Sequence, residues 1–309
     1  MQKSQLSCTA GDGVEISVEC WLPDGPPRAV LQIVHGLAEH AARYGRLAQA
    51  LTSAGYAVYA GDLRGHGRTA KGPSDLGHFA DHDGWQKCLD DLRQIHLRMT
   101  SDHPEKPVML LGHSMGSTLA RDFMARHGDG LAAVVLSGSS GQPTPLASSG
   151  RLAARLERLR LGPRGHSRML QSLSFDAFNK KFEPARTKFY WLSRDPVEVY
   201  KYIADPLCGF PASTQLWIDL LDAWARIARG SSLAAVPRRL PVYVISGAHD
   251  PVSAGARTIE PMLAQYREAG MQRVEHRFYA EARHELFNET NREEVTRDLI
   301  VWLDEKQEP

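Results

Sequence analysis

Long hydrophobic runs, paired cysteine motifs and an excess of charge of either sign are all missing from this chain. No apolar stretch of the 309 residues approaches the roughly 18 residues that a membrane-spanning helix needs. The N-terminus, MQKSQLSCTAGDGVEISVEC, has neither the apolar region nor the cleavage site of a signal peptide. The four cysteines, Cys8, Cys20, Cys88 and Cys208, lack CxxC spacing, which argues against a disulfide framework or a zinc site.

The composition is that of an ordinary soluble globular protein, with 42% hydrophobic and 24% charged residues. The formal net charge is +1, so bulk charge favours neither nucleic acid nor an acidic partner. Scattered cysteines without a leader predict reduced thiols and a cytoplasmic protein. We therefore expect no metal, no cofactor and no nucleic-acid partner.

Apolar runs alternate with helical patterns in the first and last parts of the chain. Strands are predicted at 13–21, 29–36, 56–62, 106–114, 131–138, within 239–252 and at 273–280. Helices are predicted at 46–55, 85–99, 115–128, 257–268 and 291–304. This order predicts an α/β fold with a mostly parallel, doubly wound sheet. A mostly helical insertion at 139–235 would separate two parts of one core, 1–138 and 236–309.

The segment GHSMG, residues 112–116, matches G-x-S-x-G and places Ser114 between two glycines. The pattern is weak alone, but here it follows the apolar run VMLLG and precedes a helical pattern. A serine on such a strand-to-helix turn forms the nucleophile elbow of hydrolases, because flanking glycines leave room for a strained turn. Ser114 is therefore a candidate nucleophile, and the alternative is a small residue in a tight turn.

A serine nucleophile needs a histidine base and a carboxylate that orients it, and with this elbow the chain order is serine, acid, histidine. His249 and His284 both follow predicted strands, at the sheet edge where such sites form. Asp250 follows the strand before the last one, and His284 follows the last strand. We take Asp250 and His284 as the candidate acid and base. The alternatives are an Asp-Pro turn and a histidine at a helix start.

Two backbone N–H groups are needed to stabilise the oxyanion of an acyl-transfer intermediate. Met115, directly after the candidate nucleophile, is expected to supply one. The loop VHGLAEH at 34–40 is expected to supply the other from Leu37, since Gly36 lets the backbone come close. An ordinary glycine turn at the strand end is the alternative.

With these residues identified, the sequence resembles the monoacylglycerol lipase and lysophospholipase branch of the α/β-hydrolases. The matching segments are HGLAEHAARY, GDLRGHGRT, LLGHSMG, SGAHDPV and EARHELFNE, in the family's order. The resemblance implies an α/β-hydrolase fold with a helical lid, and hydrolysis of lipid esters through an acyl-enzyme. It also implies a pocket for the glycerol end of the substrate at Glu39, Arg43 and His113. A surface ion pair beside a packed histidine is the alternative there.

Two positions depart from the family pattern. Leu37 and Ala38 stand where Ala-Gly is common, and Ser117 stands where a third glycine is common. We expect the larger Leu37 to narrow the alcohol side of the site. A backbone donor survives such a change, so the triad chemistry does not depend on it.

The insertion is expected, by family analogy, to cover the nucleophile. Its aromatic residues suit either an acyl-chain channel or the insertion's own core: Phe175, Phe178, Phe182, Phe189, Tyr190, Trp191, Tyr200 and Tyr202. Residues 151–168 carry six arginines, and Leu152, Leu156 and Leu159 share one helical face. The segment predicts either a peripheral contact with membranes or a solvated arginine face over a buried leucine stripe.

Other motifs and the triad itself are compatible with further functions. GHGRTA at 65–70 matches a dinucleotide fingerprint, but no helix follows it. His78, His82 and Asp83 fit a solvated loop better than a metal site. The same triad would also serve a small-ester carboxylesterase, a thioesterase or an aminopeptidase. A silent hydrolase-fold binding protein typically loses a triad member, and this chain keeps all three.

Overall fold

In the part of the chain that the structure describes, eight strands form one sheet in the order β1-β2-β4-β3-β5-β6-β7-β8. The computed structural model describes residues 1–143 and 145–306. The strands are β1 (Gln2–Thr9), β2 (Glu15–Leu22), β3 (Ala29–Val34), β4 (Tyr56–Gly61), β5 (Val108–His113), β6 (Ala133–Ser137), β7 (Val242–Gly247) and β8 (Val274–Tyr279). β2 pairs antiparallel with β1 and β4, and every other neighbouring pair is parallel. This confirms the predicted mostly parallel α/β sheet.

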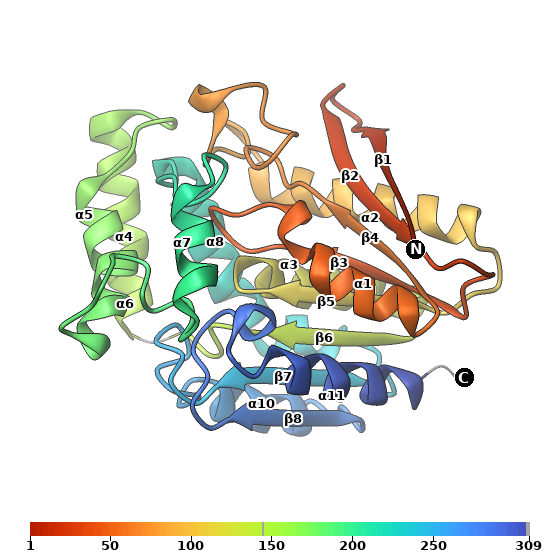
Figure 1. The fold of residues 1–309 in the computed structure, drawn as a ribbon. Coiled ribbons are helices and arrows are strands. Elements are labelled where there is room, and N and C mark those ends of the chain that lie inside the picture. The colour runs from red at the N-terminus through yellow and green to blue at the C-terminus, as the bar shows by residue number, and fades with distance from the viewer. Residues whose placement is uncertain (144, 307–309) are drawn as a thin grey trace.

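Helices cover both faces of the sheet (Figure 1). They are α1 (Gly45–Ser53), α2 (Gly84–Asp102), α3 (Met115–His127), α4 (Pro145–Leu161), α5 (Arg168–Gln171), α6 (Ala177–Asn179), α7 (Pro196–Ala204), α8 (Thr214–Ile227), α9 (Gly230–Ala234), α10 (Ile259–Glu268) and α11 (Arg292–Asp304). Short 3-10 helices are η1 (Ala41–Tyr44), η2 (Pro73–Asp75), η3 (Gly128–Gly130), η5 (Lys180–Phe182) and η6 (Leu286–Asn288), and η4 (Ser172–Asp176) is a short π-helix.

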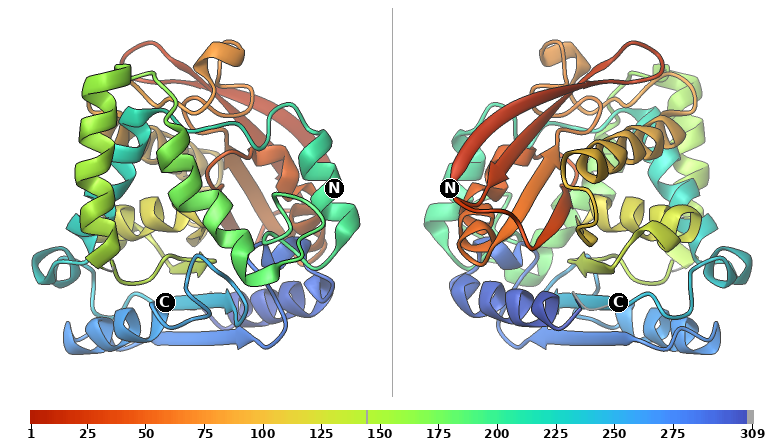
Figure 2. Two further views of the ribbon diagram at one scale, coloured as in Figure 1. Left: turned by 90° about the vertical axis from the view of Figure 1, so that its left-hand side faces the viewer. Right: turned by 90° about the vertical axis from the view of Figure 1, so that its right-hand side faces the viewer.

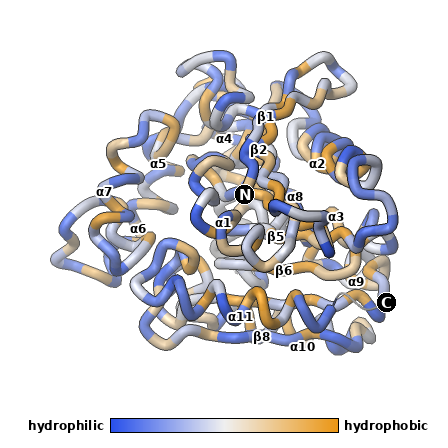
Figure 3. Tube along the Cα trace, turned by 45° about the vertical axis from the view of Figure 1, so that its right-hand side comes forward, coloured by the Kyte–Doolittle hydropathy of each residue, from blue (hydrophilic) through white to orange (hydrophobic). Residues whose placement is uncertain are grey.

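The two faces of the sheet carry separate hydrophobic clusters. α1 and α11 pack on one face, where Leu51 and Leu299 meet residues such as Leu111. α2, α3 and α10 pack on the other face, around Phe123 and Leu110. All six residues in each of β3, β4 and β5 are buried, as expected for parallel strands covered on both sides. Along α11, hydrophobic and hydrophilic stretches alternate with the helical repeat (Figure 3).

The strand β1 was not predicted, because its residues are mostly exposed and show no buried alternation. It lies at the edge of the described sheet, where β2 is its neighbour. An edge strand is held by backbone pairing and so needs no apolar pattern of its own.

Residues 139–235, here called the cap, include α4 to α9; α4 to α7 lie beyond the carboxyl ends of the parallel strands (Figure 2), whereas α9 packs against α3 and α10. Leu216 and Trp217 of α8 belong to the same hydrophobic cluster as Phe123 of α3. The cap therefore packs against the core through α8, and α4 packs on α8 farther from the sheet. The three-part division at 138 and 235 remains a prediction.

The orientation of α4 contradicts the expected buried leucine stripe. Leu152, Leu156 and Leu159 are 61%, 57% and 81% exposed. Arg151 and Arg155 instead face α8, where each forms an ion pair with Asp222. The arginines find a carboxylate partner on the neighbouring helix, so the leucines point to solvent. Among the described residues, no helix is long and apolar enough to cross a membrane.

Candidate active site

Ser114 lies on the sharp turn between β5 and α3, with a φ of +54°. Such a positive φ is strained for a residue with a side chain. The turn depends on its glycines, because a Cβ on Gly112 would lie 2.3 Å from the carbonyl oxygen of Gly116. A Cβ on Gly116 would lie 2.1 Å from the carbonyl oxygen of Val34. The glycines of GHSMG therefore hold Ser114 at the carboxyl edge of the sheet, as predicted for an elbow.

Three side chains from three loops meet at this edge. His284 Nε2 lies 2.9 Å from Ser114 Oγ, and His284 Nδ1 lies 2.9 Å from Asp250 Oδ2. A carboxylate only accepts, so Nδ1–H donates to Asp250, and Nε2 is left to accept from the serine hydroxyl. Asp250 is fully buried and its other oxygen accepts from the N–H of Val252. The structure thus brings together the three residues that the sequence selected.

The surroundings of His284 favour its charged form. Burial alone lowers the pKa of a histidine, but the charge of Asp250 and its hydrogen bond outweigh this and raise the pKa of His284 above its ordinary value. The neighbouring ring of His113 lies 4.8 Å away, centroid to centroid. Burial and the charge on His284 lower the pKa of His113 to about 4, so His113 is neutral near pH 7. The ring of Trp191, from the cap, lies 5.0 Å from His284.

The loop that carries His284, residues 280–291, is fastened to the cap. The N–H of Glu285 donates to the carbonyl of Leu192 at 2.8 Å. The carboxylate of Glu289, which is fully buried, accepts from the N–H groups of Arg283 at 2.8 Å and Arg194 at 3.1 Å. Its other oxygen accepts from Arg194 Nε at 2.8 Å. Displacing this part of the cap would break these bonds and shift the loop that positions His284.

The loop after β3 approaches Ser114 closely. A Cβ on Gly36 would lie 2.9 Å from Glu39 Oε1 and 3.1 Å from Ser114 Cβ, so any larger residue would have to displace these side chains. Ala38 has a φ of +57°, and its carbonyl accepts from the Tyr202 hydroxyl at 2.8 Å and from the N–H of Gly209 at 2.9 Å. Tyr202 and Gly209, both in the cap, therefore hold the carbonyl of Ala38, the residue that follows Leu37.

The expected oxyanion donors, Leu37 and Met115, both line the cavity above Ser114. Within the described part of the chain, neither N–H donates to a protein acceptor. Met115 is the first residue of α3, and an N–H in the first turn of a helix has no partner within that helix. Both groups are thus available to a ligand.

Glu39 and Arg43 form a buried ion pair rather than the surface pair of the alternative interpretation. Arg43 donates to Glu39 Oε2 at 2.6 Å and to both oxygens of Glu285 at 2.7 Å. The second oxygen of Glu39 accepts from the N–H of Gly36 at 2.6 Å. Burial raises the pKa of a carboxyl group, but Arg43 outweighs it and the pKa of Glu39 falls to about 2. Glu39 therefore stays charged and fixes the loop that carries Leu37.

A cavity of about 500 Å³ opens above Ser114. Its lining includes the ionisable residues Glu39, His113 and Glu285, whereas Arg43 is not part of the lining. The cap supplies most of the apolar lining: Ala153, Leu170, Leu173, Phe175, Phe178, Trp191, Leu192, Trp217, Leu220, Leu221 and Trp224. The cavity therefore combines a polar patch beside the serine with a long apolar wall.

The aromatic residues of the cap divide between the two roles that the sequence left open. Phe175, Phe178, Trp191 and Tyr202 line the cavity. Phe189 is buried in the cap's own cluster, and Tyr200 is 55% exposed. The rings of Phe182 and Tyr190 pack against the guanidinium of Arg283.

Sequence reasoning missed several residues of the site. Trp217 and Trp224 lie in α8, where apolar residues at helical spacing are expected in any packed helix. Glu285 follows His284 directly, but nothing in the sequence indicated that it faces Arg43. Tyr202 was singled out only as an aromatic residue, and its bond to Ala38 was not foreseen.

Comparisons with known proteins cover almost the whole chain. The family described as serine aminopeptidase, S33, matches residues 25–291. A monoacylglycerol lipase of Mycolicibacterium smegmatis is 31% identical and spans 97% of this chain and 97% of its own length. The human monoglyceride lipase is 30% identical over 73% of this chain and 68% of its own length.

Solved structures agree with the sequence relatives. A carboxyl esterase from Bacillus coagulans, solved in complex with glycerol, has a TM-score of 0.90 at 27% identity and covers 98% of both chains. A lipase in an open form has a TM-score of 0.87 at 28% identity and covers 100% of both chains. The likeness therefore extends through the cap as well as the sheet.

Proposed function

The chain belongs to the α/β-hydrolase family described as serine aminopeptidase, S33, and within it we propose a lipid ester hydrolase with Ser114 as nucleophile. Its substrates would be of the monoacylglycerol or lysophospholipid class. The observation that carries the proposal is the hydrogen-bonded chain Ser114–His284–Asp250 at the floor of an apolar cavity of about 500 Å³. The relatives named as monoacylglycerol lipases support the same reaction.

The reaction follows from the geometry of the triad. Ser114 Oγ attacks the ester carbonyl carbon while His284 Nε2 takes the hydroxyl proton. Asp250 holds the tautomer in which Nε2 is free and stabilises the imidazolium. The N–H groups of Leu37 and Met115 stabilise the oxyanion. The intermediate collapses when His284 returns the proton to the leaving alcohol, and Ser114 keeps the acyl group.

Water then releases the acyl group by the same steps, with water as the attacking group and Ser114 as the leaving group. His284 takes a proton from water, the hydroxide oxygen bonds to the acyl carbon, and the proton returns to Ser114 Oγ as the acid leaves. The acid product carries the acyl chain, and the enzyme is restored.

The lining of the cavity suggests how a lipid ester would lie. The apolar wall from the cap suits an acyl chain, which gains about 0.8 kcal/mol for each methylene that leaves water. The polar patch of Glu39 and His113 beside Ser114 suits the alcohol, and Arg43 acts by holding Glu39 and Glu285 in place. An aminopeptidase would need free carboxylates for the substrate amine, whereas both of these glutamates are paired with Arg43.

Hydrolysis of p-nitrophenyl esters from C2 to C16 tests this function. We expect the highest kcat/KM at C8 or longer, and loss of activity in Ser114→Ala. Monoacylglycerols and lysophospholipids of the best chain length would then be compared for the head group. A maximum at C2–C4 would favour a small-ester carboxylesterase on the same triad, and activity that survives Ser114→Ala would overturn the mechanism.

A peripheral contact with membranes is the second part of the proposal. Leu152, Leu156 and Leu159 form an exposed apolar stripe on α4, on the cap that covers the cavity. Because Arg151 and Arg155 already pair with Asp222, the contact would depend on the leucines more than on basic charge. The free cysteines are consistent with a cytoplasmic location, which stays a prediction.

Sedimentation with neutral phosphatidylcholine vesicles tests the contact. We expect wild type to bind and the double variant Leu156→Glu/Leu159→Glu to lose most of its binding. Leu97→Glu, on α2 of the core, is a matched control because Leu97 is 55% exposed. Equal binding by all three proteins, or none by wild type, would contradict the contact.

A further inference from the structure

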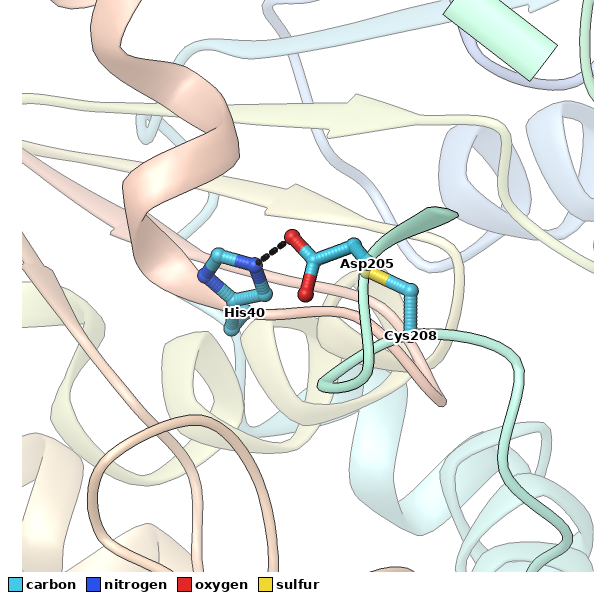
Figure 4. Close-up of side chains that lie close together, drawn as sticks. All are labelled: His40, Asp205 and Cys208. Carbon is cyan, nitrogen blue, oxygen red and sulfur yellow. Dashed lines mark hydrogen bonds and ion pairs between the residues drawn. The ribbon is translucent and has the colours of Figure 1, made fainter. Parts of the chain in front are cut away.

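Three side chains with metal-binding atoms converge beside the loop after β3 that carries Leu37, here called the oxyanion loop (Figure 4). His40 comes from the loop after β3, and Asp205 and Cys208 come from the loop that follows α7 in the cap. His40 Nε2 lies 2.9 Å from Asp205 Oδ2, and the ligand atoms of all three side chains lie within 4.8 Å of one another. This cluster belongs neither to the triad nor to the cavity lining.

The chemistry of the donor set points to one ion. An imidazole nitrogen, a carboxylate oxygen and a thiolate sulfur suit zinc, whereas calcium and magnesium prefer oxygen ligands alone. Zinc bonds of about 2.0–2.3 Å in a tetrahedron place the ligand atoms about 3.3–3.8 Å apart. His40 and Asp205 would therefore move apart by less than about 1 Å from their present separation.

The surroundings leave room for a fourth ligand and balance the charge. The side chains of His40 and Asp205 are 12% and 32% exposed, so solvent water can reach the site. On binding, the Cys208 thiol would release its proton to water, and its thiolate and the Asp205 carboxylate would together neutralise the two charges of the ion. The nearby Arg43 guanidinium, which lies over the Tyr202 ring, is itself paired with Glu39 and Glu285. Its charge is therefore already offset.

We propose that His40, Asp205 and Cys208 bind Zn²⁺, with water as the fourth ligand. The ion would link the oxyanion loop to the cap at a point where the N–H of Gly209 already donates to the carbonyl of Ala38. Opening the contact between His40 and Asp205 would shift the loop that carries Leu37. Zinc would therefore inhibit hydrolysis, and a chelator would reverse the inhibition.

Titration calorimetry of the metal-free protein with ZnCl₂ tests the site directly. We expect one ion per chain with a Kd in the micromolar range or below, and a rise in Tm that EDTA reverses. Cys208→Ser and Asp205→Asn are the informative variants, because each removes one ligand while nearly keeping the side chain's size. Cys8→Ser is the matched control, since Cys8 is a half-buried free thiol elsewhere in the chain.

The expected result is a Kd at least tenfold weaker in Cys208→Ser and in Asp205→Asn, with Cys8→Ser and His284→Ala unchanged. Retention of zinc binding by His284→Ala separates this site from binding at the triad, and makes the result independent of the proposed esterase function. Wild-type affinity in both informative variants would overturn the proposal. So would loss of binding in His284→Ala, or a wild-type protein that binds no zinc.

Discussion

Replacing Glu289 with glutamine should weaken both the fold and the reaction, because this carboxylate joins the His284 loop to the cap. One oxygen accepts from the N–H groups of Arg283 and Arg194, and glutamine can keep those bonds. The other accepts from Arg194 Nε at 2.8 Å and from the N–H of Thr290 at 2.9 Å. In Glu289→Gln an NH₂ group faces these two donors, and the charge of Arg194 loses its partner.

The size of the effect follows from those two lost bonds. A buried donor without an acceptor costs about 1–3 kcal/mol, and a broken buried ion pair costs about 3–5 kcal/mol. Arg194 is 27% exposed, so water offsets part of the loss. We therefore expect Glu289→Gln to lower the free energy of unfolding by about 3 kcal/mol, or Tm by about 6 °C at roughly 2 °C per kcal/mol.

The same change should lower kcat by about tenfold, because Arg283 precedes His284 and a small misplacement of the base is costly. KM should change little, since Glu289 does not line the cavity. Thermal unfolding and steady-state kinetics on a C8 ester measure both effects. Glu293→Gln, an exposed glutamate at the start of α11, is the control and should stay within about 0.5 kcal/mol of wild type. Wild-type Tm and kcat in Glu289→Gln would refute the reasoning.

Three further outcomes are expected. First, kcat/KM should fall on the acid side of a pKa above about 6.5, because the base must be neutral and Asp250 raises the pKa of His284. In Asp250→Asn, burial dominates and lowers the pKa of His284, so the acid limb of the pH profile should move to lower pH. The same change should reduce kcat by up to about 10⁴. An acid limb at the wild-type pH would contradict the assignment of Asp250. Second, Ala38→Val should lower Tm by several degrees because a β-branched residue resists a φ of +57°, while Ala38→Gly should keep full activity. Equal Tm values for the two variants would exclude strain at this peptide. Third, Tyr202→Phe should lower kcat a few-fold with KM unchanged, since it removes one hydrogen bond, worth about 1 kcal/mol, from the Ala38 carbonyl. An effect on KM alone would place Tyr202 in substrate binding instead.

The sheet and the position of the candidate triad could be predicted because both leave local signals. Buried parallel strands read as short apolar runs, and Ser114 and Asp250 follow two of them, β5 and β7. His284 follows β8, an edge strand whose residues are mostly not buried. The carboxyl ends of parallel strands share one edge, so their loops meet without any knowledge of packing. Flanking glycines at Ser114 gave the sharpest signal, since the turn geometry excludes a Cβ at Gly112 and Gly116.

Features that depend on the packing of the cap could not be predicted in this way. Helical periodicity separated leucines from arginines on α4, but it does not say which face meets the protein. The answer depends on Asp222, 71 residues away from Arg151 in the chain. The bond from Tyr202 to Ala38 spans 164 residues and leaves no periodic trace. The same holds for His40 and Asp205, which are 165 residues apart.

The most direct test of the account is to find which residue carries the acyl group. The protein would be treated with a long-chain fluorophosphonate, which phosphonylates an activated serine, and the modified peptide would be identified by mass spectrometry. The account predicts one label per chain, on Ser114, with loss of ester hydrolysis in proportion to labelling and no label in Ser114→Ala or His284→Ala. A label on another residue that abolishes activity, or full activity in a protein labelled at Ser114, would contradict it.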